Sequence, residues 1–144
     1  MNNYCDEIVE NLFVGSSETL NNKFDFDMIV NCTPTVNFPS YCNNCIRIPI
    51  KDDPYDSEKF LDLIDSTNVL EKMFFQINNK KNVLVHCSLG IQRSCALVAC
   101  YLIKYFNMKP IDAIELIKLK RPIAFFGNVN FLLTIVNFYN KIIL

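Results

Sequence analysis

The segment around Cys87 constrains the fold more than any other part of the chain. It begins with three apolar residues at 83–85, continues through His86 and a short loop, and reaches Arg93 at the start of an apolar stretch over 94–106. A short, fully apolar run is typical of a strand inside a parallel sheet, and the stretch that follows is typical of a buried helix. The segment therefore predicts a strand–loop–helix unit with a cysteine and an arginine at the two ends of its loop.

Such a loop is suited to binding an anion. Its free backbone N–H groups and the N-terminus of the next helix point toward one spot, and both favour negative charge. A cysteine at that spot is favoured as the thiolate. Gly90 has no Cβ, so it lets the loop curl and approach the anion. Arg93 follows Cys87 by six positions and offers a planar pair of donors that matches two phosphate oxygens. The alternative is an inert thiol, a turn glycine and a surface arginine.

The rest of the chain alternates strand and helix patterns. Apolar runs predict strands at 7–14, 26–32 and 45–50, and helical spacing predicts helices at 57–77, 110–120 and 128–143. This alternation predicts one α/β domain over residues 1–144. Its central, mostly parallel sheet is flanked by helices, and the anion-binding loop joins a central strand to a buried helix.

Composition and charge exclude several classes of protein. With 51% hydrophobic and 20% charged residues, the chain is globular rather than disordered. A formal net charge of −1 gives no basis for binding nucleic acid or an anionic membrane. We find no apolar run of the ~20 residues that a membrane helix needs.

The start of the chain and its cysteines indicate a reducing compartment. The first residues lack the positive and apolar regions of a signal peptide. Seven cysteines without such a signal predict reduced thiols and a cytoplasmic location, with the nucleus as an alternative. Cys42 and Cys45 form one CxxC pair with no second pair after it, so no zinc site is expected.

The pattern His-Cys-x5-Arg-Ser at 86–94 resembles the signature of the protein tyrosine phosphatase superfamily. The whole chain is similar to the small dual-specificity phosphatases of that superfamily. The similar stretches are 8–16, 26–32, 48–53, Arg121-Pro122 and 128–132. The short chain leaves no room for the elements that deepen a tyrosine-specific pocket. The resemblance therefore implies a shallow site that dephosphorylates phosphotyrosine, phosphoserine and phosphothreonine in proteins, with phosphoproteins as partners and no metal or organic cofactor.

The resemblance also implies roles for the loop residues. Cys87 is expected to attack phosphorus and form a cysteinyl-phosphate, while Arg93 and the loop amides hold the phosphate oxygens. Ser94 is expected to hydrogen-bond the sulfur and help it leave, although a hydroxyl at a helix start also explains it. His86 is expected to orient the loop. The residues expected to contact the phosphate are Ser88, Leu89, Gly90, Ile91 and Gln92.

The leaving group needs a proton donor, and three aspartates at 52–56 are candidates. The resemblance favours Asp52, the aspartate shortly after the Ile-Pro-Ile strand, with Asp53 as the runner-up. Asp56 is more typical of a cap for the helix that follows, and a solvated acidic turn is the alternative for the whole run.

Two further residues keep alternative interpretations. By resemblance, Arg121 contacts a second phosphate or an acidic residue of the substrate, or else is an exposed cation at a helix end. By resemblance, Cys32 forms a disulfide with oxidised Cys87, or else is a small buried hydrophobe.

Two other functions compete with protein dephosphorylation. The first is hydrolysis of RNA 5′-phosphates or phosphoinositides, but the loop has no lysine or arginine before Arg93. The second is a non-catalytic phosphopeptide-binding module, but the cysteine, the arginine and the acid are all present.

Overall fold

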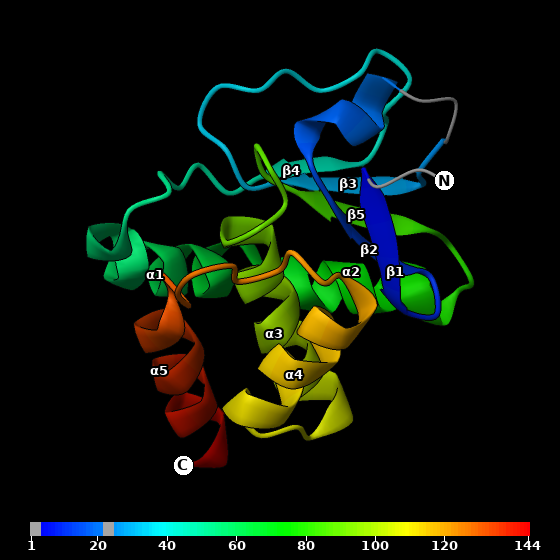
Figure 1. Ribbon diagram of the computed structural model, residues 1–144. Helices are drawn as coiled ribbons and strands as arrows, with labels where there is room; N and C mark the ends of the chain where they lie inside the picture. Colours follow the sequence, from blue (N-terminus) through cyan, green and yellow to red (C-terminus); the bar gives the residue numbers. More distant parts are fainter. Residues whose placement is uncertain (1–3, 22–24) are drawn as a thin grey trace.

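The computed structural model describes residues 4–21 and 25–144. The first three residues of the segment that was predicted not to be a signal peptide lie outside the described residues. Five strands form one sheet in the order β1-β2-β5-β3-β4 (Figure 1). Their bounds are β1 Cys5–Val9, β2 Leu12–Gly15, β3 Met28–Asn31, β4 Cys45–Arg47 and β5 Val83–His86. The strands β2, β5, β3 and β4 run parallel, and β1 pairs antiparallel with β2. The predicted mostly parallel sheet is confirmed.

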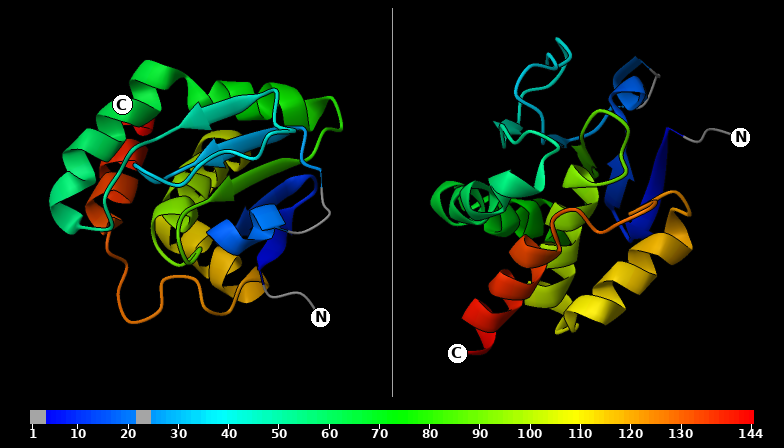
Figure 2. Two further views of the ribbon diagram at one scale, coloured as in Figure 1. Left: turned by 90° about the horizontal axis from the view of Figure 1, so that it is seen from above. Right: turned by 60° about the vertical axis from the view of Figure 1, so that its left-hand side comes forward.

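The helices lie on one side of this sheet (Figures 1 and 2). Their bounds are α1 Ser57–Thr67, α2 Val69–Asn78, α3 Arg93–Phe106, α4 Pro110–Lys120 and α5 Leu132–Ile143. The short 3-10 helix η1 Ser17–Asn21 and the segment 32–44 lie over the other face, and a second 3-10 helix, η2 Pro54–Asp56, precedes α1. The α/β class is confirmed, with the difference that α-helices cover only one face.

The two faces of the sheet bury different side chains because neighbouring residues of a strand point in opposite directions. Val83 and Val85 of β5 belong to the main core, which they share with the apolar face of α3. Leu84 belongs to a smaller cluster with Phe26 and Ile29 on the opposite face. Central strand β5 is thus buried on both sides, as its uninterrupted apolar sequence predicts.

Several predicted elements have different bounds; the last helix begins at Leu132 rather than at 128, and asparagines explain two of the other differences. The strand expected at 7–14 is the β1–β2 hairpin, which turns at Asn11 with φ 68°. The helix expected at 57–77 is divided into α1 and α2 by Asn68 with φ 54°. Asparagine tolerates this left-handed conformation better than most residues. The strand expected at 45–50 ends at Arg47, before Pro49, which lacks a backbone N–H donor.

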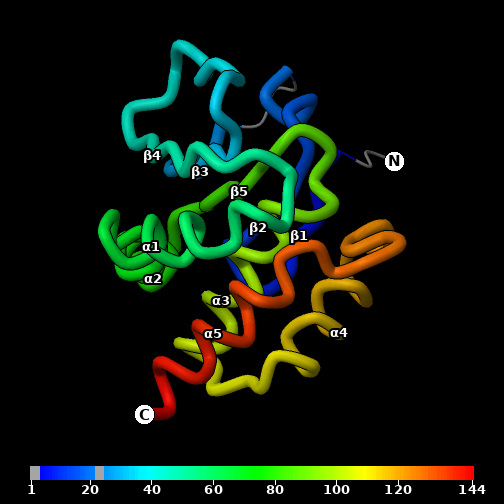
Figure 3. The backbone as a smooth tube through the Cα atoms, turned by 90° about the vertical axis from the view of Figure 1, so that its left-hand side faces the viewer, coloured from blue at the N-terminus to red at the C-terminus, as the bar shows by residue number. Residues whose placement is uncertain are grey.

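The fold brings three loops together at the carboxyl edge of the sheet. The loop after β5, the segment that follows β4 and the segment that precedes α5 meet there (Figure 3), joined by hydrogen bonds between Arg93 and Ile50 and between Gln92 and Asn128. Within the described ranges 4–21 and 25–144, no helix is both long and apolar enough to cross a bilayer.

Candidate active site

The loop between β5 and α3 packs against the end of β2 and the start of η1. Gly90 has φ +69°, and a Cβ placed on it would lie 2.6 Å from the backbone carbonyl of Gly15. A side chain at position 90 would therefore be strained and would clash. The Ser17 backbone N–H donates to the Ser88 carbonyl at 3.0 Å. Because this carbonyl bonds outside the loop, the curl is suited to turning backbone N–H groups toward an anion.

Cys87 and Ser94 meet at the N-terminus of α3. Cys87 is only 2% exposed, and its Sγ lies 3.2 Å from the Ser94 Oγ. The Ser94 hydroxyl is thus placed to donate to the sulfur whenever the sulfur is a thiolate or a leaving group. The structure brings together the two residues that the sequence paired.

Arg93 joins the loop to the segment after β4. Its Nη1 donates to the Ile50 carbonyl at 2.9 Å, and its Nη2 donates to the Ser88 Oγ at 3.2 Å. Its Nε is buried and has no hydrogen-bond partner among the described residues. An unpartnered buried N–H costs free energy, and a phosphate oxygen in the pocket would satisfy it.

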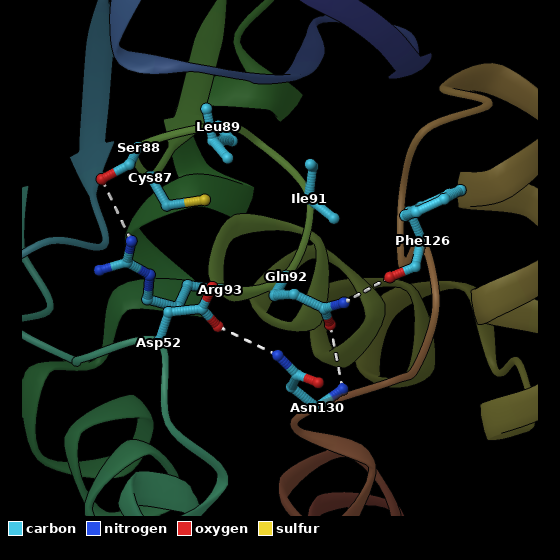
Figure 4. A pocket seen from close by; sticks show the side chains of 9 residues that line it. All are labelled: Asp52, Cys87, Ser88, Leu89, Ile91, Gln92, Arg93, Phe126 and Asn130. Carbon is cyan, nitrogen blue, oxygen red and sulfur yellow. Dashed lines mark hydrogen bonds between the residues drawn. The ribbon is translucent and has the colours of Figure 1, made fainter.

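The three aspartates after β4 have different surroundings. Asp52 lines the pocket together with Cys87 and Arg93, and its Oδ1 accepts a hydrogen bond from the Asn130 Nδ2 at 3.3 Å (Figure 4). Asp53 caps η2 by accepting from the Tyr55 N–H, and Asp56 accepts from the Lys51 N–H. Of the three, Asp52 has its carboxylate in the pocket. The residues lining this pocket are Asp52, Cys87, Ser88, Leu89, Ile91, Gln92, Arg93, Phe126 and Asn130.

His86 lies buried at the start of the loop. Its Nδ1 lies 3.1 Å from the Cys87 carbonyl, which fixes the proton on Nδ1 because a carbonyl only accepts. Burial lowers the pKa of the imidazole, mainly because the interior disfavours its charged form. The lowered pKa favours the neutral ring, and its contact with the Cys87 carbonyl is consistent with the expected role of orienting the loop.

The pocket-lining residues differ in what their side chains do. Leu89 is 67% exposed at the rim. Gln92 is buried and points away from Cys87, toward the segment before α5 (Figure 4). Gly90 has no side chain, so it can contribute only its backbone to the loop. The loop residues thus surround the predicted anion position, while the side chain of Leu89 lies at the rim and that of Gln92 contacts the neighbouring segment.

Arg121 lies behind the loop, and both roles predicted for it require correction. Its side chain is 2% exposed, so it is not an exposed helix-end cation. Its Nε donates to the Gly90 carbonyl at 2.8 Å, its Nη2 to the Leu89 carbonyl at 3.2 Å, and its Nη1 to the Asp6 carboxylate at 2.8 Å. With its guanidinium bonded to the back of the loop, Arg121 is not among the residues that line the pocket beside Cys87.

Replacing Arg121 with methionine is expected to lower the free energy of unfolding by about 3 kcal/mol, since the change leaves two carbonyls and Asp6 without their donor. Urea denaturation would measure this change. Lys118→Met, on an exposed position of α4, is the matched control and should shift stability by no more than about 0.5 kcal/mol. Equal stability of Arg121→Met and the parent chain would show that the Arg121 bonds do not support the loop.

Two buried cysteines lie near Cys87. The Cys32 backbone N–H donates to the His86 carbonyl at 2.8 Å, and burial raises the pKa of the Cys32 thiol, with Cys87 contributing to the rise. The Cys95 thiol donates to the Gly90 carbonyl at 3.5 Å, and burial also raises its pKa. Within residues 4–21 and 25–144, no three or more His, Cys, Asp or Glu side chains are grouped to hold a metal ion.

Sequence reasoning missed the contribution of the segment before α5. Asn130 and Phe126 both line the pocket, and Asn130 contacts Asp52. The two residues are 78 positions apart, and no local pattern signals a contact over that distance. The side-chain direction of Gln92 was equally hidden, because its partners come from this same segment.

Comparison with known proteins agrees with this geometry. The family model described as "Dual specificity phosphatase, catalytic domain" matches residues 12–141. The protein named Putative tyrosine phosphatase 123R of Invertebrate iridescent virus 6 is 33% identical over 121 residues, which covers 83% of this chain and 81% of the viral protein. Human Dual specificity protein phosphatase 14 is 28% identical over 125 residues, and the match covers 81% of this chain but only 60% of the human protein.

Solved structures show the same fold. The crystal structure of human DUSP28 superimposes with a TM-score of 0.86 at 20% sequence identity, and the match covers 100% of this chain and 98% of that one. The crystal structure of human DUSP15 superimposes with a TM-score of 0.75 at 23% identity, and the match covers 95% of this chain and 88% of that one. At these identities, the likeness concerns the arrangement of the elements.

Proposed function

The chain belongs to the dual specificity phosphatase family, and on that premise we propose that residues 1–144 form one catalytic domain in which Cys87 is the nucleophile. The observation that carries the proposal is the grouping of Cys87, Arg93 and Asp52 around one pocket, with the Ser94 hydroxyl at the sulfur. The activity is that of a cysteine-based protein phosphatase, and its substrates are phosphotyrosine, phosphoserine and phosphothreonine residues of proteins.

In the first step, the Cys87 thiolate attacks phosphorus. A sulfur–phosphorus bond forms, the bond from phosphorus to the leaving oxygen breaks, and Asp52 gives its proton to that oxygen. The Arg93 Nε, which has no hydrogen-bond partner in the described part of the chain, would bind one equatorial oxygen, and the loop N–H groups would bind the others. These donors act where charge spreads in the transition state.

In the second step, water attacks the cysteinyl-phosphate. The Asp52 carboxylate takes a proton from the water, the sulfur–phosphorus bond breaks, and inorganic phosphate leaves. The Ser94 hydroxyl, 3.2 Å from the sulfur, donates to the thiolate as it forms. The cycle ends with a thiolate at Cys87 and a protonated Asp52.

The proposal favours a phosphoprotein over a polyanionic substrate such as RNA or a phosphoinositide. Among residues 4–21 and 25–144, no lysine lines the pocket, and the arginine that lines it is Arg93. A nucleophilic thiol must also stay reduced, which supports a reducing compartment such as the cytoplasm or the nucleus. We infer no nucleic-acid or membrane partner, because the net charge of −1 offers none of the attraction that such partners need.

Replacing Asp52 with asparagine is expected to lower kcat/KM for phosphotyrosine peptides by ~10²-fold, because the leaving phenolate then receives no proton. Asp53→Asn is the matched control and should cost no more than a few-fold, since Asp53 caps η2 outside the pocket. Steady-state kinetics on the three proteins would measure this difference. The opposite ranking of the two variants would move the proton donor to Asp53.

A further inference from the structure

Gln92 links the catalytic loop to the segment before α5 by three hydrogen bonds. Its Nε2 donates to the Asn128 carbonyl at 2.6 Å and reaches the Phe126 carbonyl at 3.5 Å. Its Oε1 accepts from the Asn130 backbone N–H at 3.0 Å. The side chain is 5% exposed, so both ends of its amide are committed to this segment rather than to solvent (Figure 4).

Asn130 extends this link to the opposite wall of the pocket. Its backbone is fixed by Gln92, and its side-chain Nδ2 donates to the Asp52 Oδ1 at 3.3 Å. In the described part of the chain, this is the one hydrogen bond that the Asp52 carboxylate makes. Asp52 itself is exposed, so without Asn130 its side chain would exchange freely between rotamers.

We propose that Asn130, held by Gln92, is a positioning residue for Asp52, an inference that rests on the proposed role of Asp52 as the proton donor. The chemistry supports this pairing. In a protonated carboxyl the carbonyl oxygen is the better hydrogen-bond acceptor, so the bond from Asn130 to Oδ1 favours Oδ2 as the oxygen that carries the proton. Asn130 thereby selects the oxygen that acts as the acid and limits its position.

A positioning role has a different kinetic signature from a merely structural one. Proton donation matters most when the leaving group is a weak acid, such as phenol, and least when it is a stronger acid, such as p-nitrophenol. A residue that positions the donor therefore affects phenyl phosphate more than p-nitrophenyl phosphate. A residue that only supports the fold lowers kcat/KM for both substrates equally.

The test measures kcat/KM for phenyl phosphate and p-nitrophenyl phosphate in Asn130→Ala, Asn130→Asp, Asp52→Asn and the double variant Asp52→Asn/Asn130→Ala. Asn130→Asp keeps the shape of the side chain but removes its N–H donor. We expect both Asn130 variants to lose ~10-fold on phenyl phosphate and no more than ~2-fold on p-nitrophenyl phosphate. The double variant should lose no more than Asp52→Asn, because the two residues act through one proton.

Control variants separate folding from positioning. Asn137→Ala, at an exposed asparagine of α5, should leave kcat/KM for both substrates unchanged, and thermal unfolding should show that all variants are folded.

Gln92→Glu tests the residue that holds Asn130. It keeps the acceptor of Gln92 but removes its donor, and it should reproduce the selective loss on phenyl phosphate in weaker form.

The outcomes distinguish the inference from its premise. A selective loss in Asp52→Asn without one in Asn130→Ala and Asn130→Asp would overturn the positioning role and leave the proton donor in place. No selectivity in Asp52→Asn would remove Asp52 as the donor, and the inference with it. A selective loss on phenyl phosphate in Asp52→Asn and in both Asn130 variants, with the double variant losing no more than Asp52→Asn, would support both the proton donor and the positioning role.

Discussion

Replacing Cys87 with serine is expected to reduce hydrolysis of p-nitrophenyl phosphate by at least ~10⁴-fold, because the hydroxyl is a far weaker nucleophile than the thiolate at the same place. The change is nearly isosteric, and the neighbouring Ser94 Oγ at 3.2 Å can hydrogen-bond either atom. The fold and the binding of phosphate oxygens should therefore persist. The measurement is steady-state hydrolysis in buffer with reductant and a metal chelator.

The control for this prediction is Cys45→Ser, which removes a half-buried thiol from the first residue of β4. That variant should retain activity within about twofold of the parent. Activity in Cys87→Ser comparable to the parent would contradict the cysteine mechanism. Loss of the parent's activity in chelator would contradict it in another way, by showing that a metal is required.

The sequence was sufficient to predict the part of the site that is local in the chain. Cys87, Arg93 and Ser94 lie within eight positions of each other, and the strand and helix around them impose the geometry that their spacing predicts. The same holds for the central sheet, because the apolar run of β5 requires cover on both faces. Local order and burial were therefore enough to predict the fold class and the loop.

What the sequence did not predict depends on contacts between distant segments. Arg121 follows a helix, where a surface cation is typical. Its side chain is instead buried, and it bonds two loop carbonyls and Asp6, which is 115 positions away. Asn130 has no local sign of its contact with Asp52. The breaks at Asn11 and Asn68 occur where both residues adopt a left-handed backbone conformation. Asparagine tolerates this conformation but does not require it, so its presence alone did not predict the breaks.

Replacing Arg93 with lysine is expected to lower kcat/KM for phosphotyrosine peptides by ~10³-fold, although the charge is kept. The guanidinium of Arg93 already divides its donors: Nη1 bonds the Ile50 carbonyl, Nη2 bonds the Ser88 hydroxyl, and Nε has no partner among residues 4–21 and 25–144. Lysine has a single nitrogen. It cannot hold the segment after β4, brace the loop and bind a phosphate oxygen at the same time.

Vanadate inhibition would locate this loss in oxyanion binding. Since vanadate occupies the place of the phosphoryl group, its inhibition constant should rise in Arg93→Lys in step with the loss of kcat/KM. Arg47→Lys makes the same exchange at an arginine whose donors bond the Thr33 and Val36 carbonyls, and it should leave the inhibition constant unchanged. If Arg93→Lys bound vanadate as tightly as the parent while losing activity, then Arg93 would act by holding the segment that carries Asp52. Its Nη1 bond to Ile50 would then matter more than its free Nε, and the acid, rather than the phosphate, would be the group that Arg93 serves.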